Sequence, residues 1–349
     1  MTPLNPILLT LTLLLFSALA LALSNLSPGC ANPQPPDSPT PGAPSTHQTI
    51  DVPSAGGLRT YLLSLPLNPS HAPSPLILAF HGKGQTASQF ETQTQLTDPE
   101  FRLRGSIVAF PQGVHGQWLG DPTSPPRSER DDIAFARALL KQLMQEWCVD
   151  LTRVYLVGFS NGGGLTHLLA CDPEVSAHVA AAAIVSGAFY KDRSLKGDGP
   201  LFGTCNKGEA PLPILEMHGG ADPVIHYDGK STPDGETYPL TEWLGDWRER
   251  NGCAGGQSEL KRDIHDGSVQ KTEWWCGIGK QGAKDVVVHY YIRGFGHGWP
   301  STKGQDDDGQ RYGPVGWNGT SDIVEFLAGK WLGGGDEGGE VMEGTRDEL

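Results

Sequence analysis

The sequence has few positive charges, and this excludes one large class of functions. Lysine and arginine together number 26 against 40 aspartate and glutamate residues, so the formal net charge is −14. A protein that binds nucleic acid carries basic stripes that face the phosphates. We therefore expect no nucleic-acid partner.

Motifs of several other protein classes are also missing. The chain has no Cys-x-x-Cys pair and its histidines are not spaced as ligands, whereas a structural zinc site needs such groups. The phosphate-binding pattern G-x-x-x-x-G-K-[ST] does not occur. No internal repeat of about 20 to 50 residues indicates a solenoid or a propeller. We expect no metal site.

Long apolar runs are confined to the N-terminus. Residues 7–23 form one such run, which ends in small-residue sites such as Ala18-Leu19-Ala20 and is typical of a secretory signal. A membrane anchor is the competing interpretation, because a spanning helix needs about 20 apolar residues. We expect a cleaved signal peptide at residues 1–24, a mature form without a membrane partner, and secretion.

The even number of cysteines fits a secreted protein. The six are Cys30, Cys148, Cys171, Cys205, Cys253 and Cys276. An oxidising compartment predicts up to three disulfides among them, and about fifteen pairings are open. In one of these, Cys253 and Cys276 close a strand-rich hairpin, and the remaining four pair as Cys171 with Cys205 and Cys30 with Cys148.

Low-complexity segments flank the middle of the chain. Residues 25–47 are rich in Pro, Ser and Thr and are expected to form an extended tail, and residues 333–349 form an acidic, Gly-rich tail. The chain ends in Arg-Asp-Glu-Leu, which resembles the address read by the retention receptor of the endoplasmic reticulum. The lumen of the endoplasmic reticulum is therefore the alternative to secretion. Asn318 is a predicted glycosylation acceptor, and Asn25 is one only if cleavage precedes it.

Between the tails, residues 48–332 alternate short apolar runs with helical stretches. The runs lie at 58–66, 75–80, 106–110, 153–158, 181–187, 213–219 and 286–294. Such runs suit strands that are buried on both faces of a parallel sheet. The helical stretches lie at 131–147, 162–171, 238–250 and 320–332. This alternation predicts a single α/β domain with a doubly wound, mostly parallel sheet.

Ser160 directly follows one of the predicted strands and stands between Gly158 and Gly162. In α/β-hydrolases the pattern G-x-S-x-G forms a strained turn between a strand and a helix that presents a nucleophilic serine. The glycines are needed because side chains there would collide with the neighbouring strand and helix. The pattern is short enough to occur by chance, so a plain glycine-rich turn is the alternative.

A nucleophilic serine needs a histidine base, and the base needs an acid to fix its tautomer. In this fold the acid and then the histidine follow the serine along the chain. Asp222 follows one predicted strand and His297 follows the next, at the carboxyl ends where ligands bind in such sheets. We predict these two residues as acid and base. A turn-capping Asp222, a plain loop histidine at 297, and His226 as the base are the alternatives.

The same fold predicts an oxyanion hole made of two backbone N–H groups. One belongs to the residue after the nucleophile, which is Asn161. The other comes from the loop after an earlier strand, where "LILAFHGKGQT" makes Lys83 the expected donor. A glycine turn or an anion-binding nest is the alternative interpretation of this loop.

The segments "AFHGKGQTA", "GFSNGGGLTHLLACDP", "HGGADPVIHY" and "GFGHGWPST" resemble those of secreted fungal feruloyl esterases. Polyhydroxybutyrate depolymerases and acetylxylan esterases are similar more distantly. The resemblance covers residues 48–332 and implies an α/β-hydrolase fold. It also implies hydrolysis of hydroxycinnamate esters on plant cell-wall polysaccharide, with Ser160 as nucleophile, His297 as base and Asp222 as acid. Hydrolysis of acetyl or polyester groups on the same scaffold is the alternative.

Two further expectations concern the substrate. Hydroxyl, imidazole and N–H groups suffice for acyl transfer, so no cofactor is expected. Because ferulate is a flat aromatic acid, we expect an aromatic wall, for which Trp118 and Trp299 are the candidates. Packing in the core or at the surface is the alternative role of each tryptophan.

Overall fold

The computed structural model describes residues 25–32, 38–67, 73–191, 205, 211–232, 235–253, 259–276, 283–302 and 316–332. The predicted signal peptide and the acidic tail with its Arg-Asp-Glu-Leu end lie outside the described residues. Among the residues described, no helix has the length and apolar character that a membrane span requires.

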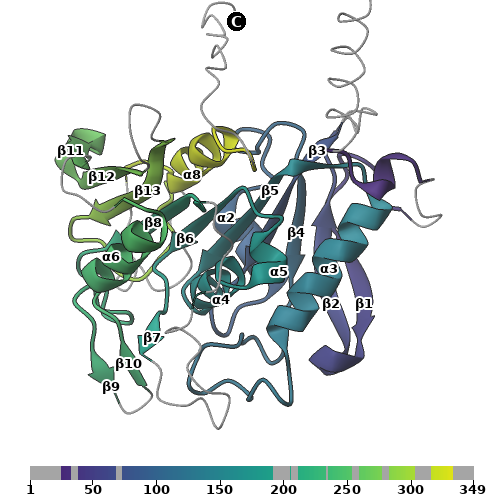
Figure 1. The fold of residues 1–349 in the computed structure, drawn as a ribbon, viewed down its shortest axis with the longest axis horizontal. Helices are drawn as coiled ribbons and strands as arrows, with labels where there is room; N and C mark the ends of the chain where they lie inside the picture. Colours follow the sequence, from purple (N-terminus) through teal and green to yellow (C-terminus); the bar gives the residue numbers. More distant parts are fainter. Residues whose placement is uncertain are drawn as a thin grey trace, which may run out of the picture.

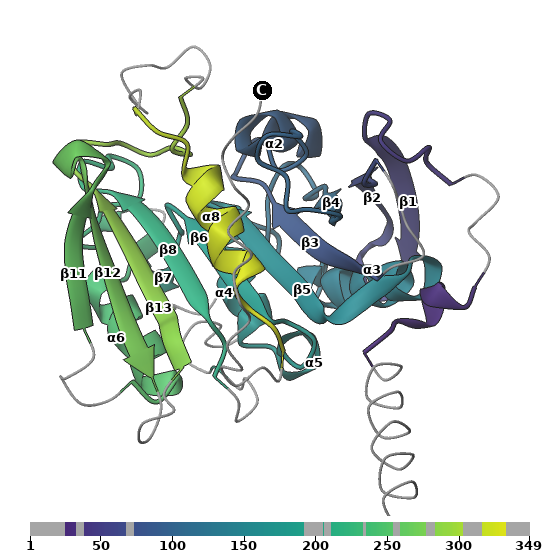
Figure 2. The ribbon, with the colours of Figure 1, turned by 90° about the horizontal axis from the view of Figure 1, so that it is seen from above.

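Ten strands form one central sheet (Figures 1 and 2). They are β1 (Thr46–Val52), β2 (Gly57–Ser64), β3 (Ser74–Phe80), β4 (Ile107–Pro111), β5 (Val149–Phe159), β6 (Ala181–Val185), β8 (Ile214–Gly219), β11 (Glu259–Ile264), β12 (Val269–Cys276) and β13 (Ala283–Ile292). Their order is β1-β2-β4-β3-β5-β6-β8-β13-β12-β11. The central run from β4 to β13 is parallel, and both ends of the sheet are antiparallel. The predicted, mostly parallel sheet of an α/β-hydrolase is confirmed.

Helices cover both faces of this sheet (Figure 2). They are α2 (Ala87–Thr94), α3 (Asp132–Glu146), α4 (Asn161–Ala170), α5 (Pro173–Ser176), α6 (Leu240–Arg250) and α8 (Gly319–Ala328). Apolar side chains of α3, α4, α5 and α6 build a core on one face, and those of α2 and α8 build the core on the other. Short strands β7 (Tyr190–Lys191), β9 (Ser231–Thr232) and β10 (Gly235–Thr237) form a small second sheet.

Sequence patterns explain where these elements begin and why they are buried. Strands β3, β4, β6 and β8 are buried at every residue, as expected for continuous apolar runs between two helical layers. Helix α3 begins after Asp131, whose carboxylate accepts hydrogen bonds from the N–H groups of Ile133 and Ala134. This is the capping role that aspartate commonly has at a helix start.

The extended tail predicted for residues 25–47 is wrong at both of its ends. Ser27 donates its N–H to the carbonyl of Val149, at 3.0 Å, and its hydroxyl to that of Trp147, at 2.7 Å. Strand β1 already begins at Thr46 and pairs with β2. Backbone and hydroxyl groups make these contacts, so the polar composition of the segment gives no sign of them.

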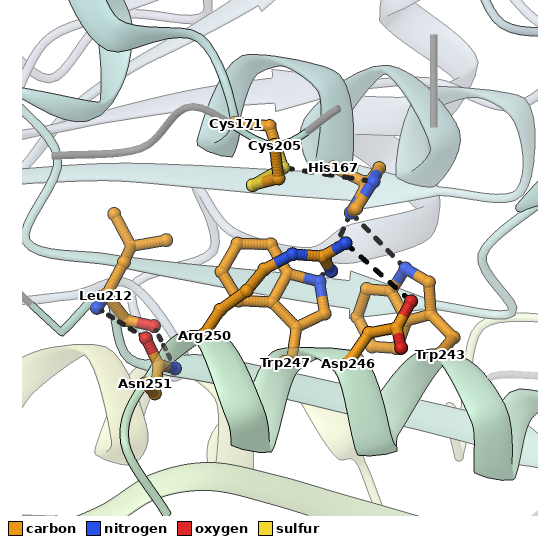
Figure 3. Close-up of a disulfide and its surroundings, with 9 residues drawn as sticks. All are labelled: His167, Cys171, Cys205, Leu212, Trp243, Asp246, Trp247, Arg250 and Asn251. Carbon is orange, nitrogen blue, oxygen red and sulfur yellow. Dashed lines mark hydrogen bonds and ion pairs between the residues drawn. A yellow bond between two sulfur atoms is a disulfide. The ribbon is translucent and has the colours of Figure 1, made fainter. Parts of the chain in front are cut away.

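The structure contains three disulfides, which join Cys30 to Cys148, Cys171 to Cys205, and Cys253 to Cys276. They close loops with sequence separations of 118, 34 and 23 residues. In the chain-entropy model each contributes on the order of 3–5 kcal/mol to the free energy of unfolding. Figure 3 shows the second disulfide where α4 packs against α6.

Candidate active site

Ser160 is positioned by the tight connection between β5 and α4. Its backbone has φ 51° and ψ −117°, an unfavourable conformation for a residue with a side chain. A Cβ atom at Gly158 would collide with Gly162 and Thr166 of α4, and one at Gly162 would collide with the carbonyl of Phe80 on β3. The two glycines of the G-x-S-x-G pattern are therefore packing requirements of the turn.

The structure brings Ser160, His297 and Asp222 together in one hydrogen-bonded line. His297 Nε2 lies 2.9 Å from Ser160 Oγ, and His297 Nδ1 lies 2.7 Å from Asp222 Oδ2. Asp222 follows β8 and His297 follows β13, and these two strands are parallel neighbours. In this geometry an imidazole can accept the serine proton while a carboxylate fixes its tautomer.

Asp222 is held by both of its carboxylate oxygens. Its Oδ1 accepts hydrogen bonds from the N–H groups of Val224 and Ile225, each at 2.8 Å, so the residue also forms the turn considered as its alternative role. Burial opposes ionisation, but hydrogen bonds from His218 and His297 outweigh it and hold the pKa of Asp222 below its ordinary value. The residue is therefore a carboxylate at neutral pH.

The alternative base, His226, lies elsewhere. Its Nε2 is 3.2 Å from the Nζ atom of Lys230, in a pair exposed to solvent. The serine is thus paired with the histidine after β13, and that histidine is paired with the aspartate after β8.

Asn161 connects the serine turn to the loop that holds Trp118. Its Oδ1 accepts a hydrogen bond from the Trp118 N–H at 2.8 Å, and its Nδ2 donates to the Trp118 carbonyl at 3.1 Å. Asn161 is the first residue of α4, and the first N–H groups of a helix have no partner within it. The backbone N–H of Asn161 remains our predicted oxyanion donor.

The loop that carries Lys83 is fixed by its neighbours. The N–H of Gly82 donates to Gln85 Oε1 at 2.8 Å. The Lys83 ammonium extends to Asp121 Oδ2, at 3.2 Å, and to the hydroxyl of Thr123, at 2.6 Å. The side chain is thus occupied with another loop, and the backbone N–H of Lys83 is the group predicted to bind an oxyanion.

The aromatic wall predicted from Trp118 and Trp299 is wrong. The two side chains are 0% and 1% exposed, so neither has surface that a substrate could touch. The indole of Trp118 donates to the carbonyl of His81, and that of Trp299 donates to the hydroxyl of Thr320, each at 2.9 Å. Both tryptophans support the loops around the site from within.

The glycosylation site predicted at Asn318 is also wrong. Asn318 caps α8, with its Oδ1 accepting from the N–H of Thr320 at 2.9 Å, while its Nδ2 donates to Gln95 Oε1 at 2.8 Å. A glycan would have to be attached to this same nitrogen in an exposed loop. Asn318 is only 9% exposed, so the folded chain has no room for one.

Glu216 and His218 of β8 stand behind Asp222 and were not selected from the sequence. Their side chains are 0% and 1% exposed. The available signal was the pattern Glu-x-His within an otherwise apolar strand, "PILEMHG", since buried charges are rare unless they are paired. Among the residues described, no group of three or more His, Cys, Asp and Glu side chains could hold a metal ion.

Comparison with known proteins places these residues in context. No family model matches the chain. Feruloyl esterase C of Emericella nidulans is 30% identical over 227 residues, which cover 63% of this chain and 71% of that protein. Feruloyl esterase B of Piromyces equi is 32% identical over 190 residues, which cover 52% of this chain and 33% of that protein.

A solved structure supports the fold. The acetyl xylan esterase of Aspergillus awamori superposes with a TM-score of 0.54 over 76% of this chain and 98% of that chain. The two sequences are 17% identical, so this similarity concerns the fold alone.

Proposed function

Since the chain belongs to the feruloyl esterase family and is a carboxylic ester hydrolase of the carbohydrate-esterase kind, we propose that it releases hydroxycinnamic acids from plant cell-wall polysaccharide. The reaction proceeds through an acyl-enzyme on Ser160. The observation that carries this proposal is the continuous contact from Ser160 Oγ through His297 to Asp222.

In the first step, His297 Nε2 takes the proton of Ser160 as Oγ attacks the ester carbonyl carbon. The carbonyl oxygen becomes negative and accepts hydrogen bonds from the N–H groups of Asn161 and Lys83. Such donors stabilise the transition state by about 3–4 kcal/mol each. The Asp222 carboxylate stabilises the imidazolium that forms.

In the second step, the bond between the acyl carbon and the sugar oxygen breaks. The His297 imidazolium gives its proton to that oxygen, and the feruloyl group remains on Ser160. Water then attacks the acyl-enzyme with His297 again as base, which releases the free acid and restores the serine.

Secretion is part of the proposal. Three disulfides require an oxidising compartment in most organisms, and the apolar N-terminal run supplies a route into it. Retention in the endoplasmic reticulum by a receptor for the final four residues is the alternative. Fractionation of cells that express the full chain separates the two: medium holding nearly all of the protein contradicts retention, and a lumenal pool that is lost when residues 346–349 are deleted supports it.

The substrate class is tested with purified protein on methyl ferulate, methyl p-coumarate and acetylated xylan, beside Ser160→Ala. We expect release of hydroxycinnamic acids by the wild-type protein and loss of that release in the variant. Turnover of acetylated xylan alone would contradict the proposed substrate and favour an acetylxylan esterase.

A further inference from the structure

A line of buried ionisable groups lies behind Asp222, and no step of the proposed mechanism uses it. Glu216 and His218 are two positions apart on β8 and therefore lie on the same face of the sheet. His289 is the register partner of Glu216 on the neighbouring strand β13. Burying a carboxylate costs considerable free energy unless it is paired, so the position of Glu216 needs a physical reason.

The contacts of His218 determine its charge. Its Nδ1 lies 3.0 Å from Glu216 Oε1, and its Nε2 lies 2.8 Å from the carbonyl of Ile225 and 3.4 Å from Asp222 Oδ2. All of these partners are acceptors, whereas a neutral imidazole has one nitrogen that cannot donate. Only the imidazolium satisfies both sides of the ring. Burial opposes the charge, but Glu216 and Asp222 outweigh it and raise the pKa of His218 to about 10.

The far side of Glu216 faces a second buried histidine, His289 of β13. His289 Nδ1 lies 2.9 Å from Glu216 Oε2, and His289 Nε2 lies 3.0 Å from the hydroxyl of Tyr227. The other oxygen of Glu216, Oε1, is the one that contacts His218 Nδ1. The line of charges is therefore negative at Glu216, positive at His218 and negative at Asp222.

We propose that His218, held as an imidazolium by Glu216, is a positioning residue that fixes Asp222 and sets the pH range in which His297 can act as a base. This inference rests on the proposed function. His218 and His297 contact the same oxygen, Asp222 Oδ2. Their nitrogens consequently lie within roughly 6 Å of each other, a range in which like charges oppose one another. The positive charge on His218 thus makes protonation of His297 harder and keeps the base neutral at lower pH.

The other titratable groups around His218 do not reverse this effect. Tyr227 packs edge-on against the imidazole, and burial and the charge of Glu216 raise the pKa of its hydroxyl above its ordinary value. Tyr291 is the register partner of His218 on β13, and its ring packs edge-on against Tyr227. Glu216 and Asp222 supply the charges that face the ring.

The test is the pH dependence of kcat/KM for methyl ferulate in His218→Gln. The glutamine can still donate to the Ile225 carbonyl but carries no charge. We expect the acid limb, which reports the protonation of His297, to move up by about one pH unit. On that limb kcat/KM then falls about tenfold at a given pH. His218→Lys restores a positive charge and should move the limb back toward its wild-type position.

His167→Gln is the matched control. His167 is also buried, but its Nδ1 accepts from the indole N–H groups of Trp243 and Trp247, at 3.2 and 3.1 Å (Figure 3). Burial, with a further contribution from Arg250, lowers its pKa to about 3, so the substitution removes a buried imidazole that carries no charge. We expect a lower Tm and an acid limb in its wild-type position.

A measurement on the wild-type protein keeps the proposal testable if the His218 variants do not fold. The ¹⁵N chemical shifts of the His218 ring at pH 7 should show two protonated nitrogens. A neutral ring, or a folded His218→Gln protein with an unshifted acid limb, overturns the inference. If Ser160→Ala keeps its activity, the proposed mechanism fails instead, whatever the state of His218.

Discussion

His167 and His218 are both buried in the same domain, yet we expect His167 to be neutral and His218 to be positively charged. His167 lies between α4 and α6 and accepts hydrogen bonds from two indole groups (Figure 3). His218 lies on β8 between two carboxylates. Burial disfavours the charged form in both places, so the partners decide the outcome. Donors around a histidine keep it neutral, whereas acceptors on both sides make it a cation.

The difference matters because only one of the two histidines contacts the candidate site. His218 shares an oxygen of Asp222 with His297, so its charge can influence the reaction. His167 lies on α4 and is hydrogen-bonded to Trp243 and Trp247 of α6. We expect the cluster around His167 to contribute to stability and the groups around His218 to contribute to activity.

The largest expected effect is that of Ser160→Ala, which tests whether the site that His218 adjoins uses Ser160 as its nucleophile. Without the hydroxyl no acyl-enzyme can form, and kcat should fall by about 10⁴–10⁶-fold. Steady-state hydrolysis of methyl ferulate measures this, with circular dichroism as the check on folding. Undiminished hydrolysis in a folded variant would contradict the assignment of Ser160 as the nucleophile.

Asp222→Asn should have the next largest effect. The amide leaves the shape of the site unchanged but no longer fixes the His297 tautomer, and a loss of about 10⁴-fold in kcat is expected. Removing this negative charge also leaves His218 with one counter-ion, Glu216, in place of two. A loss in kcat of less than tenfold would show that Asp222 has only its turn-forming role.

A third prediction concerns the disulfide beside His167. Replacing Cys171 and Cys205 by serine opens a loop with a sequence separation of 34 residues and should lower the free energy of unfolding by about 3–4 kcal/mol. Urea denaturation measures the loss, and kcat per folded molecule should stay unchanged. Serine at Cys253 and Cys276, with a separation of 23 residues, is the matched control and should give a similar loss. A lower kcat in the first pair alone would contradict a purely stabilising role.

A further prediction concerns the pH dependence of stability. The pKa of His218 is raised to about 10, so its contribution to the free energy of unfolding is complete below its ordinary pKa near 6.5 and is lost as pH rises through 10. The pKa of His167 is lowered to about 3, so its contribution is present above about 6.5 and is lost as pH falls toward 3.

Urea denaturation between about pH 4.5 and 9.5 compares the two histidines directly. The stability difference between wild type and His218→Gln should shrink toward alkaline pH. For His167→Gln the difference should shrink toward acidic pH. Slopes of the same sign for the two variants would mean that the two histidines have the same charge state.

Much of the fold and the central constellation could be predicted from sequence. Apolar runs such as those at β3 and β6 are readily recognised, because a strand buried on both faces consists mostly of apolar residues. Ser160, Asp222 and His297 follow β5, β8 and β13, and the carboxyl ends of these parallel strands lie at the same edge of the sheet. These features depend on local pattern and connectivity, which a single sequence contains.

The elements that were missed depend on contacts made after folding. Strand β11 is exposed along most of its length, so its side chains show no apolar pattern and only pairing with β12 makes it a strand. Helix α2 has eight residues and is fixed by the reciprocal cap of Thr86 and Gln89. The burial of Trp118 likewise depends on the carbonyl of His81, a partner 37 positions away.

The central claim is that the reaction passes through a covalent ester on Ser160. Acid quenching during turnover of methyl ferulate, followed by digestion and mass spectrometry of the peptides, tests it directly. We expect a feruloyl group on the peptide that contains Ser160, and no such adduct in Ser160→Ala. A feruloyl group on a different residue would contradict the account. Hydrolysis of methyl ferulate by Ser160→Ala at the wild-type rate would also contradict it.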